Sequence, residues 1–468
     1  MKWQYHAAAI AMCTALTACS VGPTYKRPDI PPPAQWRETA SSDYHTGDDA
    51  LSVWPQATWW HGFGSSKLDD LVAEAQRNND DLAGAIARVQ EADAQARVAG
   101  AALLPTLDVG ATATRERAAT SGVGTRLFNQ FSPQVSASYE LDFWGKNRAL
   151  HDAARATAVA SRYDQQTVAL TVVSSVATTY FQALELRDRI QVAQQNLANS
   201  RKILAGFKAQ QSAGTATGLD VAQQETAVAL LSAAVPPLQQ QFRQTVNALA
   251  VLTGKTPESL DIDTGSLSTL TVPPVAEGMP AQLLSRRPDV AEAEQQLIAA
   301  NADITVARAA LFPDIKLTAS GGYASAALTA LVSPPNRVYA ISAGLTQPIF
   351  HGGALRGQLA YSKARYTELL TTYHKTAITA FSNVENALVA VQQTAEQQKR
   401  QQDAVATARR AFGFAQTQMS AGVVNILTVL NTENTLFSAQ DALLQINYLH
   451  LQGLVELFTA LGGGWQQG

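Results

Sequence analysis

The strongest constraint on the fold is that the chain repeats one series of landmarks about 208 residues later. Ser-Ala-Gly ends at Gly214 and again at Gly422, and 422 − 214 = 208. Two further pairs follow the same order: Ala-Ala-Leu-Leu-Pro105 with Ala-Ala-Leu-Phe-Pro313, and Phe-Trp-Gly145 with Phe-His-Gly352. Self-similarity at a fixed period indicates a duplicated structural unit. The sequence therefore predicts repeats over 67–254 and 288–462, joined by a linker at 255–287 and followed by a tail at 463–468.

Each repeat contains two stretches in which apolar and polar residues alternate. In 134–143 every second residue is apolar, and the residues between them are Gln, Ser, Glu or Asp. Because successive side chains of a strand point to opposite faces, this pattern predicts strands with one apolar and one polar face. The expected strands lie near 104–117, 131–144, 312–325 and 337–350.

A long proline-free run follows the second strand of each repeat. The run over 146–211 would extend roughly 100 Å as one helix. A helix of that length needs neighbours along its whole length, as in a coiled coil. Glycine commonly ends a helix because it adopts the left-handed backbone cheaply. Helical hairpins with tips near 212–218 and 420–426 are therefore expected, one in each repeat.

The N-terminus has the pattern of a bacterial signal peptide over 1–18, with Lys2 ahead of a short apolar core. It ends in Leu-Thr-Ala-Cys19, which resembles the lipobox of a lipoprotein. Cys19 is therefore expected to carry lipid, and the other reading is an ordinary signal with a chance cysteine. Residues 19–66 are expected to form the anchor, a proline-rich extended strap and an equatorial segment.

Alternation by itself also fits an ordinary soluble sheet. The lipoprotein signal favours a membrane barrel, and no segment after the signal peptide is expected to span a membrane as a helix. Four strands cannot close a membrane barrel, so closure would require several chains.

Composition and motifs argue against other classes of protein. A net charge of −3 with 16% charged residues provides no basic surface for nucleic acid. The histidines beyond the signal peptide are scattered and no phosphate-binding loop is present, so neither a metal site nor an enzyme is expected. No cofactor is expected besides the lipid on Cys19. Asp289, after Arg287 and Pro288, is expected to begin a helix.

Several motifs in order identify the chain as similar to a known family. They are Trp59-Trp60-His-Gly-Phe63 with Leu68-Asp-Asp-Leu71, Leu141-Asp-Phe-Trp-Gly145, Arg286-Arg-Pro-Asp289, Ala307-Arg-Ala-Ala-Leu-Phe-Pro313 and Ala460-Leu-Gly-Gly-Gly-Trp465. The set resembles the lipoprotein branch of TolC-like outer-membrane efflux factors, the NodT group. The resemblance implies an α+β membrane protein: a homotrimer whose protomers each give four strands to a twelve-stranded outer-membrane barrel, joined to a periplasmic helical coiled-coil barrel. It also implies an equatorial belt formed by 54–64, 256–280 and the C-terminal segment.

The resemblance further implies the exit duct of a tripartite efflux pump. Such a duct passes drugs or other small compounds from a periplasmic adaptor protein and an inner-membrane RND-type transporter to the outside. Two alternatives remain open: a lipid-anchored structural coiled-coil trimer without transport, and the exit duct of a protein secretion system.

The hairpin tips are the part of the chain where the resemblance places function. It implies a periplasmic gate, for which the candidates are Leu427, Asn431 and Asp220. Asn431 stands where the family usually has Asp, so a neutral ring at the gate and a plain surface position are both open. Gln210 and Gln418 replace an arginine common in the family. Adaptor contact is therefore expected mainly from the tips themselves: Ala213, Gly214, Ala421, Gly422 and Val423.

Overall fold

The computed structural model describes residues 21–37, 54–120, 124–262, 264–274 and 280–465. The signal peptide and Cys19 lie outside the described residues. The chain forms two compact units. Unit 1 comprises the chain up to Asp29, Ala87–Arg162 and Glu292–His374, and unit 2 comprises Ile30–Ile86, Tyr163–Ala291 and Lys375–Gly468. Each unit thus collects corresponding parts of both sequence repeats.

Unit 1 contains one antiparallel sheet with the strand order β1-β2-β3-β4. The strands are β1 (Thr106–Thr120), β2 (Gly124–Glu140), β3 (Asp314–Tyr323) and β4 (Arg337–Thr346). Their register aligns Val109 with Val135, Val135 with Gly321 and Gly321 with Tyr339. The alternating apolar side chains have no protein core in the protomer: Val109 is 82% exposed and Tyr339 86% exposed. Such a surface suits contact with lipid.

The hairpin of the first repeat is longer than the sequence pattern suggested. β2 begins at Gly124, not near 131, because pairing with β1 continues to the pair Thr120 and Gly124. Strict alternation fails at the adjacent apolar residues Leu127 and Phe128, so this part of the strand was missed. Pro133 lies inside β2, opposite Ala111.

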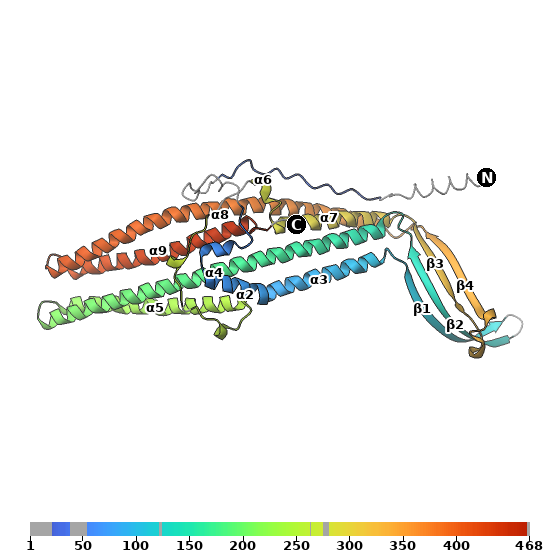
Figure 1. Cartoon of the computed structure of the whole chain (residues 1–468), viewed down its shortest axis with the longest axis horizontal. Helices are drawn as coiled ribbons and strands as arrows, with labels where there is room; N and C mark the ends of the chain where they lie inside the picture. The colour runs from blue at the N-terminus through green and yellow to red at the C-terminus, as the bar shows by residue number, and fades with distance from the viewer. Residues whose placement is uncertain (1–20, 38–53, 121–123, 263, 275–279, 466–468) are drawn as a thin grey trace. The chain divides into compact units, whose positions relative to one another are not determined.

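The two repeats have helical hairpins of the same size (Figure 1). α4 (Lys146–Ser212) and α8 (Ala354–Ser420) each have 67 residues, and α5 (Gly218–Leu252) and α9 (Ile426–Ala460) each have 35. Shorter helices precede the strands and include α2 (Ser66–Asn78), α3 (Asp80–Ala101), α6 (Pro280–Leu283) and α7 (Pro288–Ala309). α5 continues through Pro236 and Pro237. Interior proline normally breaks a helix, so the sequence alone favours a break at this pair that the structure does not show.

Contrary to the expectation that no segment after the signal peptide is long and apolar enough to span a membrane, one segment within α4 passes that test by length and composition. In the protomer 44% of that segment is buried. Val172, Val176 and Phe181 are almost fully buried in this part of α4. Packing within the protein therefore explains part of its apolar character.

The core of unit 2 joins the N-terminal aromatic motif to the C-terminal helix. Trp59, in the short 3-10 helix η3 (Trp59–Phe63), stacks on Phe458 of α9 with ring centroids 5.1 Å apart. Gly462 and Gly464 have positive φ, and a Cβ atom on either would overlap neighbouring backbone. Close packing and the positive φ together explain why glycine is required at both positions.

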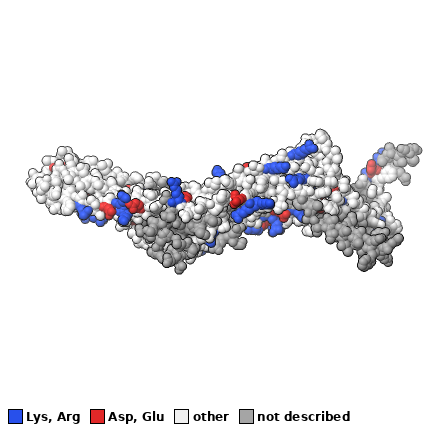
Figure 2. Space-filling model, turned by 90° about the horizontal axis from the view of Figure 1, so that it is seen from above, with Lys and Arg blue, Asp and Glu red and all other residues white. Residues whose placement is uncertain are grey.

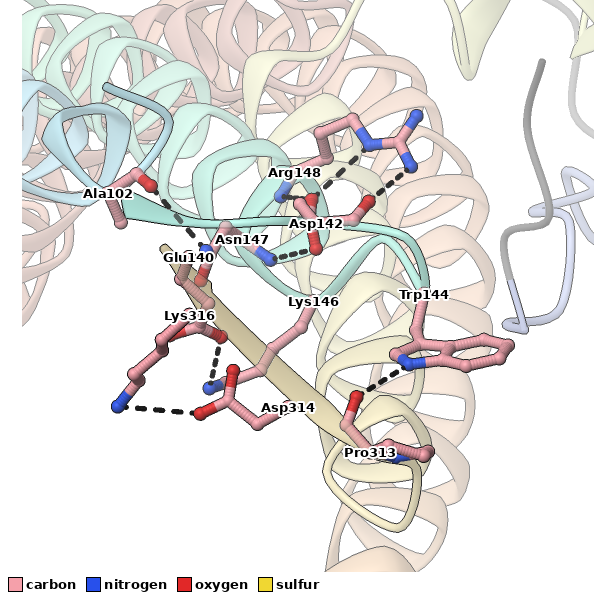
Figure 3. A network of polar contacts seen from close by, with 10 residues as sticks. All are labelled: Ala102, Glu140, Asp142, Trp144, Lys146, Asn147, Arg148, Pro313, Asp314 and Lys316. Atoms are coloured by element: carbon pink, nitrogen blue, oxygen red, sulfur yellow. Dashed lines mark hydrogen bonds and ion pairs between the residues drawn. The ribbon is translucent and has the colours of Figure 1, made fainter. Parts of the chain in front are cut away.

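Several polar contacts stabilise the junction between β2 and α4 in unit 1 (Figure 3). Asp142 accepts hydrogen bonds from the backbone amides of Asn147 (3.0 Å) and Arg148 (2.8 Å), which lie in the first turn of α4. Trp144 donates from Nε1 to the Pro313 carbonyl over 2.8 Å. The first amides of a helix lack partners within it, so Asp142 completes the start of α4.

The described start of the strap lies along α7 in unit 1. Arg308 donates to the Val21 carbonyl over 2.7 Å, and Asn301 donates to the Pro23 carbonyl over 3.0 Å. A Cβ atom on Gly22 would overlap the side chain of Thr305. This start of the strap is therefore closely fitted to α7.

Candidate functional site

The two hairpin tips of unit 2 are closed by the same backbone motif. Gly214 and Gly422 adopt φ values of 76° and 73°. The amide of Gly214 bonds to the Gln211 carbonyl, and the next amide bonds to the Gln210 carbonyl; the second tip has the same pair of bonds at Gly422 and Val423. This is a Schellman ending, which uses glycine because L-residues are disfavoured in the left-handed region.

The returning helices begin with different caps. Thr217 accepts from the Asp220 amide while the Asp220 carboxylate accepts from the Thr217 amide (2.8 Å) and hydroxyl (2.7 Å). In the second tip Asn425 accepts from the amide of Thr428 over 3.3 Å. The hydrogen bonds from Thr217 lower the pKa of Asp220. Both caps provide hydrogen-bond acceptors for backbone amides that have no partner within the helix at its start.

The capping role changes the interpretation of Asp220. At the repeat distance of 208 residues its counterpart is Thr428 (220 + 208 = 428), not Asn431. Its carboxylate is engaged by Thr217. Asp220 therefore caps α5 at the first tip, and its predicted place in the gate stays a prediction.

Leu427 and Asn431 lie one turn apart on α9. Leu427 is 49% exposed and Asn431 is also exposed in the protomer. Because residues four apart share a face of a helix, both belong to one exposed stripe. Their position as gate residues stays a prediction.

The predicted contact residues Ala213, Gly214, Ala421, Gly422 and Val423 are all exposed. Val423 is 71% exposed, and a Cβ atom on either glycine would have no neighbour within 4 Å. Charged side chains are sparse over the hairpin ends on the face that Figure 2 shows. The tips therefore present small and apolar groups together with backbone.

An apolar cluster beneath the tips joins the two hairpins. Its buried members are Phe207 of α4, Val221 of α5 and Ile426 of α9. Met419 and Leu430 of the second hairpin pack against them. A second cluster farther along α9 contains Val405, Ala408, Leu436 and Phe437. The two tips are thus parts of one packed structure.

Polar contacts also attach α9 to both long helices. Arg189 of α4 binds Asp441 through Nε (2.6 Å) and Nη2 (3.1 Å), and its Nη1 binds Glu185 (3.0 Å). On the other side Thr394 of α8 contacts His450 over 3.0 Å. Burial lowers the pKa of His450 and raises that of Glu185.

A buried carboxyl group near the tips was not singled out by the sequence analysis. Glu433 of α9 is 1% exposed, although Glu225, its repeat counterpart, is exposed. Burial raises the pKa of Glu433 to about 7, and hydrogen bonding to Ser200 and Gln224 partly offsets this effect. A sequence signal existed: the residues three and four positions away on both sides are apolar, namely Val429, Leu430, Leu436 and Phe437.

Within the part of the chain that the structure describes, no group of three His, Cys, Asp or Glu side chains could hold a metal ion. The described tips consist of exposed residues above a buried apolar cluster.

Comparison with known proteins gives a consistent result. The family described as "Outer membrane efflux protein" matches residues 71–255 and 279–463, two segments that are again 208 residues apart (279 − 71 = 208). The chain is 40% identical to the pyoverdine export outer membrane protein OpmQ of Pseudomonas aeruginosa, over 98% of this chain and 96% of OpmQ. It is 32% identical to the cation efflux system protein CusC of Escherichia coli, over 97% of both chains.

Solved structures agree with these sequence matches. A membrane protein from Pseudomonas aeruginosa superimposes with a TM-score of 0.87 at 30% identity, covering 95% of this chain and all of the other. The open state of the Neisseria gonorrhoeae MtrE outer membrane channel gives 0.85 at 26% identity, covering 96% and 99%. These superpositions, together with the two matched segments of this chain, confirm the predicted α+β fold class with two repeats. The chain belongs to the outer membrane efflux protein family, and it is an outer-membrane efflux channel with a periplasmic helical extension.

Proposed function

We propose that the channel is the exit duct of a tripartite pump, fed by a periplasmic adaptor and an RND-type inner-membrane transporter. The observation that carries this proposal is the pair of exposed, matching tips on each chain. Three chains would present six such tips, a number suited to a ring of adaptors. Contact would rely on backbone and on small apolar groups such as Val423, because neither Gln210 nor Gln418 supplies a positive charge.

The names of two relatives suggest a first candidate for the transported compound. Two OpmQ proteins, at 40% and 38% identity, are named for pyoverdine export. We propose that this chain exports small organic compounds, with a siderophore of that class as the first to test. Deleting the gene should leave the siderophore in the periplasm and sensitise the cell to exported drugs, and the wild-type gene should reverse both effects. Unchanged export and unchanged resistance would favour a structural coiled-coil trimer.

Substitution of tip residues by Trp tests adaptor contact separately. Ala213→Trp and Ala421→Trp should reduce crosslinking to the adaptor, because both positions are exposed and expected to lie in the contact. A matched control is Ala354→Trp, at the start of α8 and in unit 1. Equal crosslinking by all three variants would contradict contact at the tips.

We propose that Leu427 narrows the periplasmic mouth and that Asn431 lines it without charge. A ring of three carboxylates would repel itself and attract cations, and an amide does neither. Leu427→Ala should raise closed-state conductance in planar bilayers, and Asn431→Asp should raise cation selectivity. If neither variant changes leakage or selectivity, the gate lies elsewhere.

The lipid on Cys19 is also a proposal. Arg308 donates a hydrogen bond to the carbonyl of Val21, and five residues separate Arg308 from β3 (314 − 308 − 1 = 5), which supports an anchor on this part of the chain. Cys19→Ser should abolish labelling with radioactive palmitate. Retained labelling would refute the anchor. No other cofactor is proposed.

A further inference from the structure

Glu433 differs from its repeat counterpart in both burial and pairing. Glu225 forms an ion pair with Lys208 at 2.7 Å and is about half exposed. Glu433, at 225 + 208 = 433, is 1% exposed and has no ion pair among the described residues. It lies on α9 between Leu430, which packs into the tip cluster, and Leu436 of the second apolar cluster. The same sequence position is therefore solvated in one hairpin and enclosed in the other.

Ser200 and Gln224 hydrogen-bond to Glu433, yet two oxygens of this cluster stay without a donor. Gln224 of α5 is fully buried and donates from Nε2 to the Ser200 hydroxyl (2.8 Å) and carbonyl (3.2 Å) of α4. The remaining oxygen of Gln224, Oε1, is buried without a partner, and so is Oε1 of Glu433. An ionised carboxylate can only accept hydrogen bonds, whereas a protonated one supplies an O–H. One proton on Glu433 would therefore add a donor to a cluster in which two buried oxygens have none.

Electrostatics favours the same protonation state. Burying a carboxylate without a cation is costly, and no charge on a described residue contributes to the pKa of Glu433. The ionisable side chains nearest in sequence to the cluster on the surrounding hairpin helices are exposed: Arg201, Lys202 and Lys208 on α4, Glu225 on α5, and Asp403, Arg409 and Arg410 on α8.

We propose that Ser200, Gln224 and Glu433 form a proton-binding site that couples the packing of α9 on the first hairpin to pH. With the proton bound, the cluster is neutral and its O–H can satisfy a buried acceptor. When the proton leaves for solvent, a carboxylate remains among apolar side chains, and packing of α9 near the tips weakens. Asn431 and Leu427 lie on the same helix two and six residues away, so the site would regulate the proposed gate. That last consequence rests on the proposed function.

The sign of the pH effect follows from linkage. The carboxyl group has its ordinary pKa near 4.5 in the unfolded chain and about 7 in the folded chain. The folded state therefore binds more protons between these values, so this stabilisation is complete below pH 4.5 and is lost as the pH rises toward 7. The equilibrium constant for local opening of α9, here called the opening constant, should rise across this window. The rise should be up to about tenfold per pH unit relative to a variant without the carboxyl group.

Infrared spectroscopy of the purified, lipid-reconstituted channel tests protonation directly. The wild type should show the C=O band of a protonated carboxyl that titrates near neutral pH. Glu433→Gln should lack this band, and Glu225→Gln is the matched control that should keep it. Absence of a titrating band in the wild type, or its survival in Glu433→Gln, would overturn the proposal. The wild-type titration remains decisive even if Glu433→Gln fails to assemble.

Hydrogen exchange of amides in the tip half of α9 tests the coupling. The ratio of wild-type to Glu433→Gln opening constants, compared at equal pH, should rise between about pH 5 and about pH 7. The corresponding ratio of wild-type to Glu225→Gln opening constants should not change with pH. A wild-type to Glu433→Gln ratio that does not change with pH would refute the coupling. Neither measurement uses transport, so loss of export in a gene deletion tests the proposed function independently.

Discussion

Arg189 of α4 binds Asp441 of α9 through two parallel hydrogen bonds, from Nε to Oδ1 over 2.6 Å and from Nη2 to Oδ2 over 3.1 Å. The third guanidinium contact goes to Glu185, one turn earlier on α4. The Arg189 side chain is only 19% exposed. The guanidinium therefore fixes the returning helix of the second repeat against the long helix of the first.

Replacing Asp441 by Ala should weaken this attachment. The loss should be about 1 kcal/mol, because Asp441 is 40% exposed and solvent screens the pair, while Arg189 keeps Glu185. A double-mutant cycle with Arg189→Ala, measured by chemical unfolding, should give coupling of that size. The exposed pair of Arg400 and Glu396 is the control and should give near zero. Equal coupling in both cycles would contradict a special role for Arg189.

Removing the carboxylate at the junction of strand and helix should destabilise the start of α4. Asp142→Ala leaves the amides of Asn147 and Arg148 without their acceptor, at a cost of about 1–2 kcal/mol. The melting temperature of the trimer on a heated SDS gel should fall. Lys316→Ala removes only a 3.4 Å surface pair and should change stability by less than about 0.5 kcal/mol. A larger effect of Lys316→Ala than of Asp142→Ala would reverse this assignment.

Enlarging Gly22 should release the strap from α7. An added Cβ would overlap Thr305, so Gly22→Ala should cost about 1–3 kcal/mol of strap packing. Limited proteolysis should then cut residues 21–37 faster. Gly357→Ala in α8 is the control, because its Cβ would meet nothing within 4 Å and alanine favours a helix. Unchanged cleavage of Gly22→Ala would show that the strap is held without this contact.

Buried His450 should lower the stability of unit 2 at acidic pH. Burial lowers its pKa from 6.5, so the unfolded chain binds the proton more readily. Stability is then complete above the unfolded pKa and falls as the pH drops below about 6.5. His450→Gln should flatten this loss in thermal melts at different pH values, whereas replacement of exposed His374 should not. An unchanged slope in His450→Gln would exclude this histidine as its source.

Asp220 should affect the stability of the first tip but not leakage through the channel. Asp220→Ala removes one side of the reciprocal cap with Thr217, which should cost about 1 kcal/mol. Hydrogen exchange in the first turn of α5 should increase, while closed-state conductance should match the wild type. Increased leakage with unchanged exchange would restore Asp220 as a gate residue.

Much of the architecture was predictable because it depends on local periodicity. The alternating pattern in 134–143 and the glycines at 214 and 422 are visible in the sequence and follow from strand and helix geometry. The early start of β2 at Gly124 was not visible, because pairing with β1 continues through residues whose pattern does not alternate. The helical course of α5 through Pro236 was equally hidden.

The sequence by itself determined the duplication, the strands and hairpins, and the resemblance to efflux channels, since each rests on residues at fixed spacing. Only the tertiary structure decided the different roles of matching residues. Glu225 and Glu433 share one place in the repeat, yet one is ion-paired in solvent and the other is buried near Ser200 and Gln224. The physical reason is that repetition determines the backbone, whereas burial depends on which neighbouring helix covers each face.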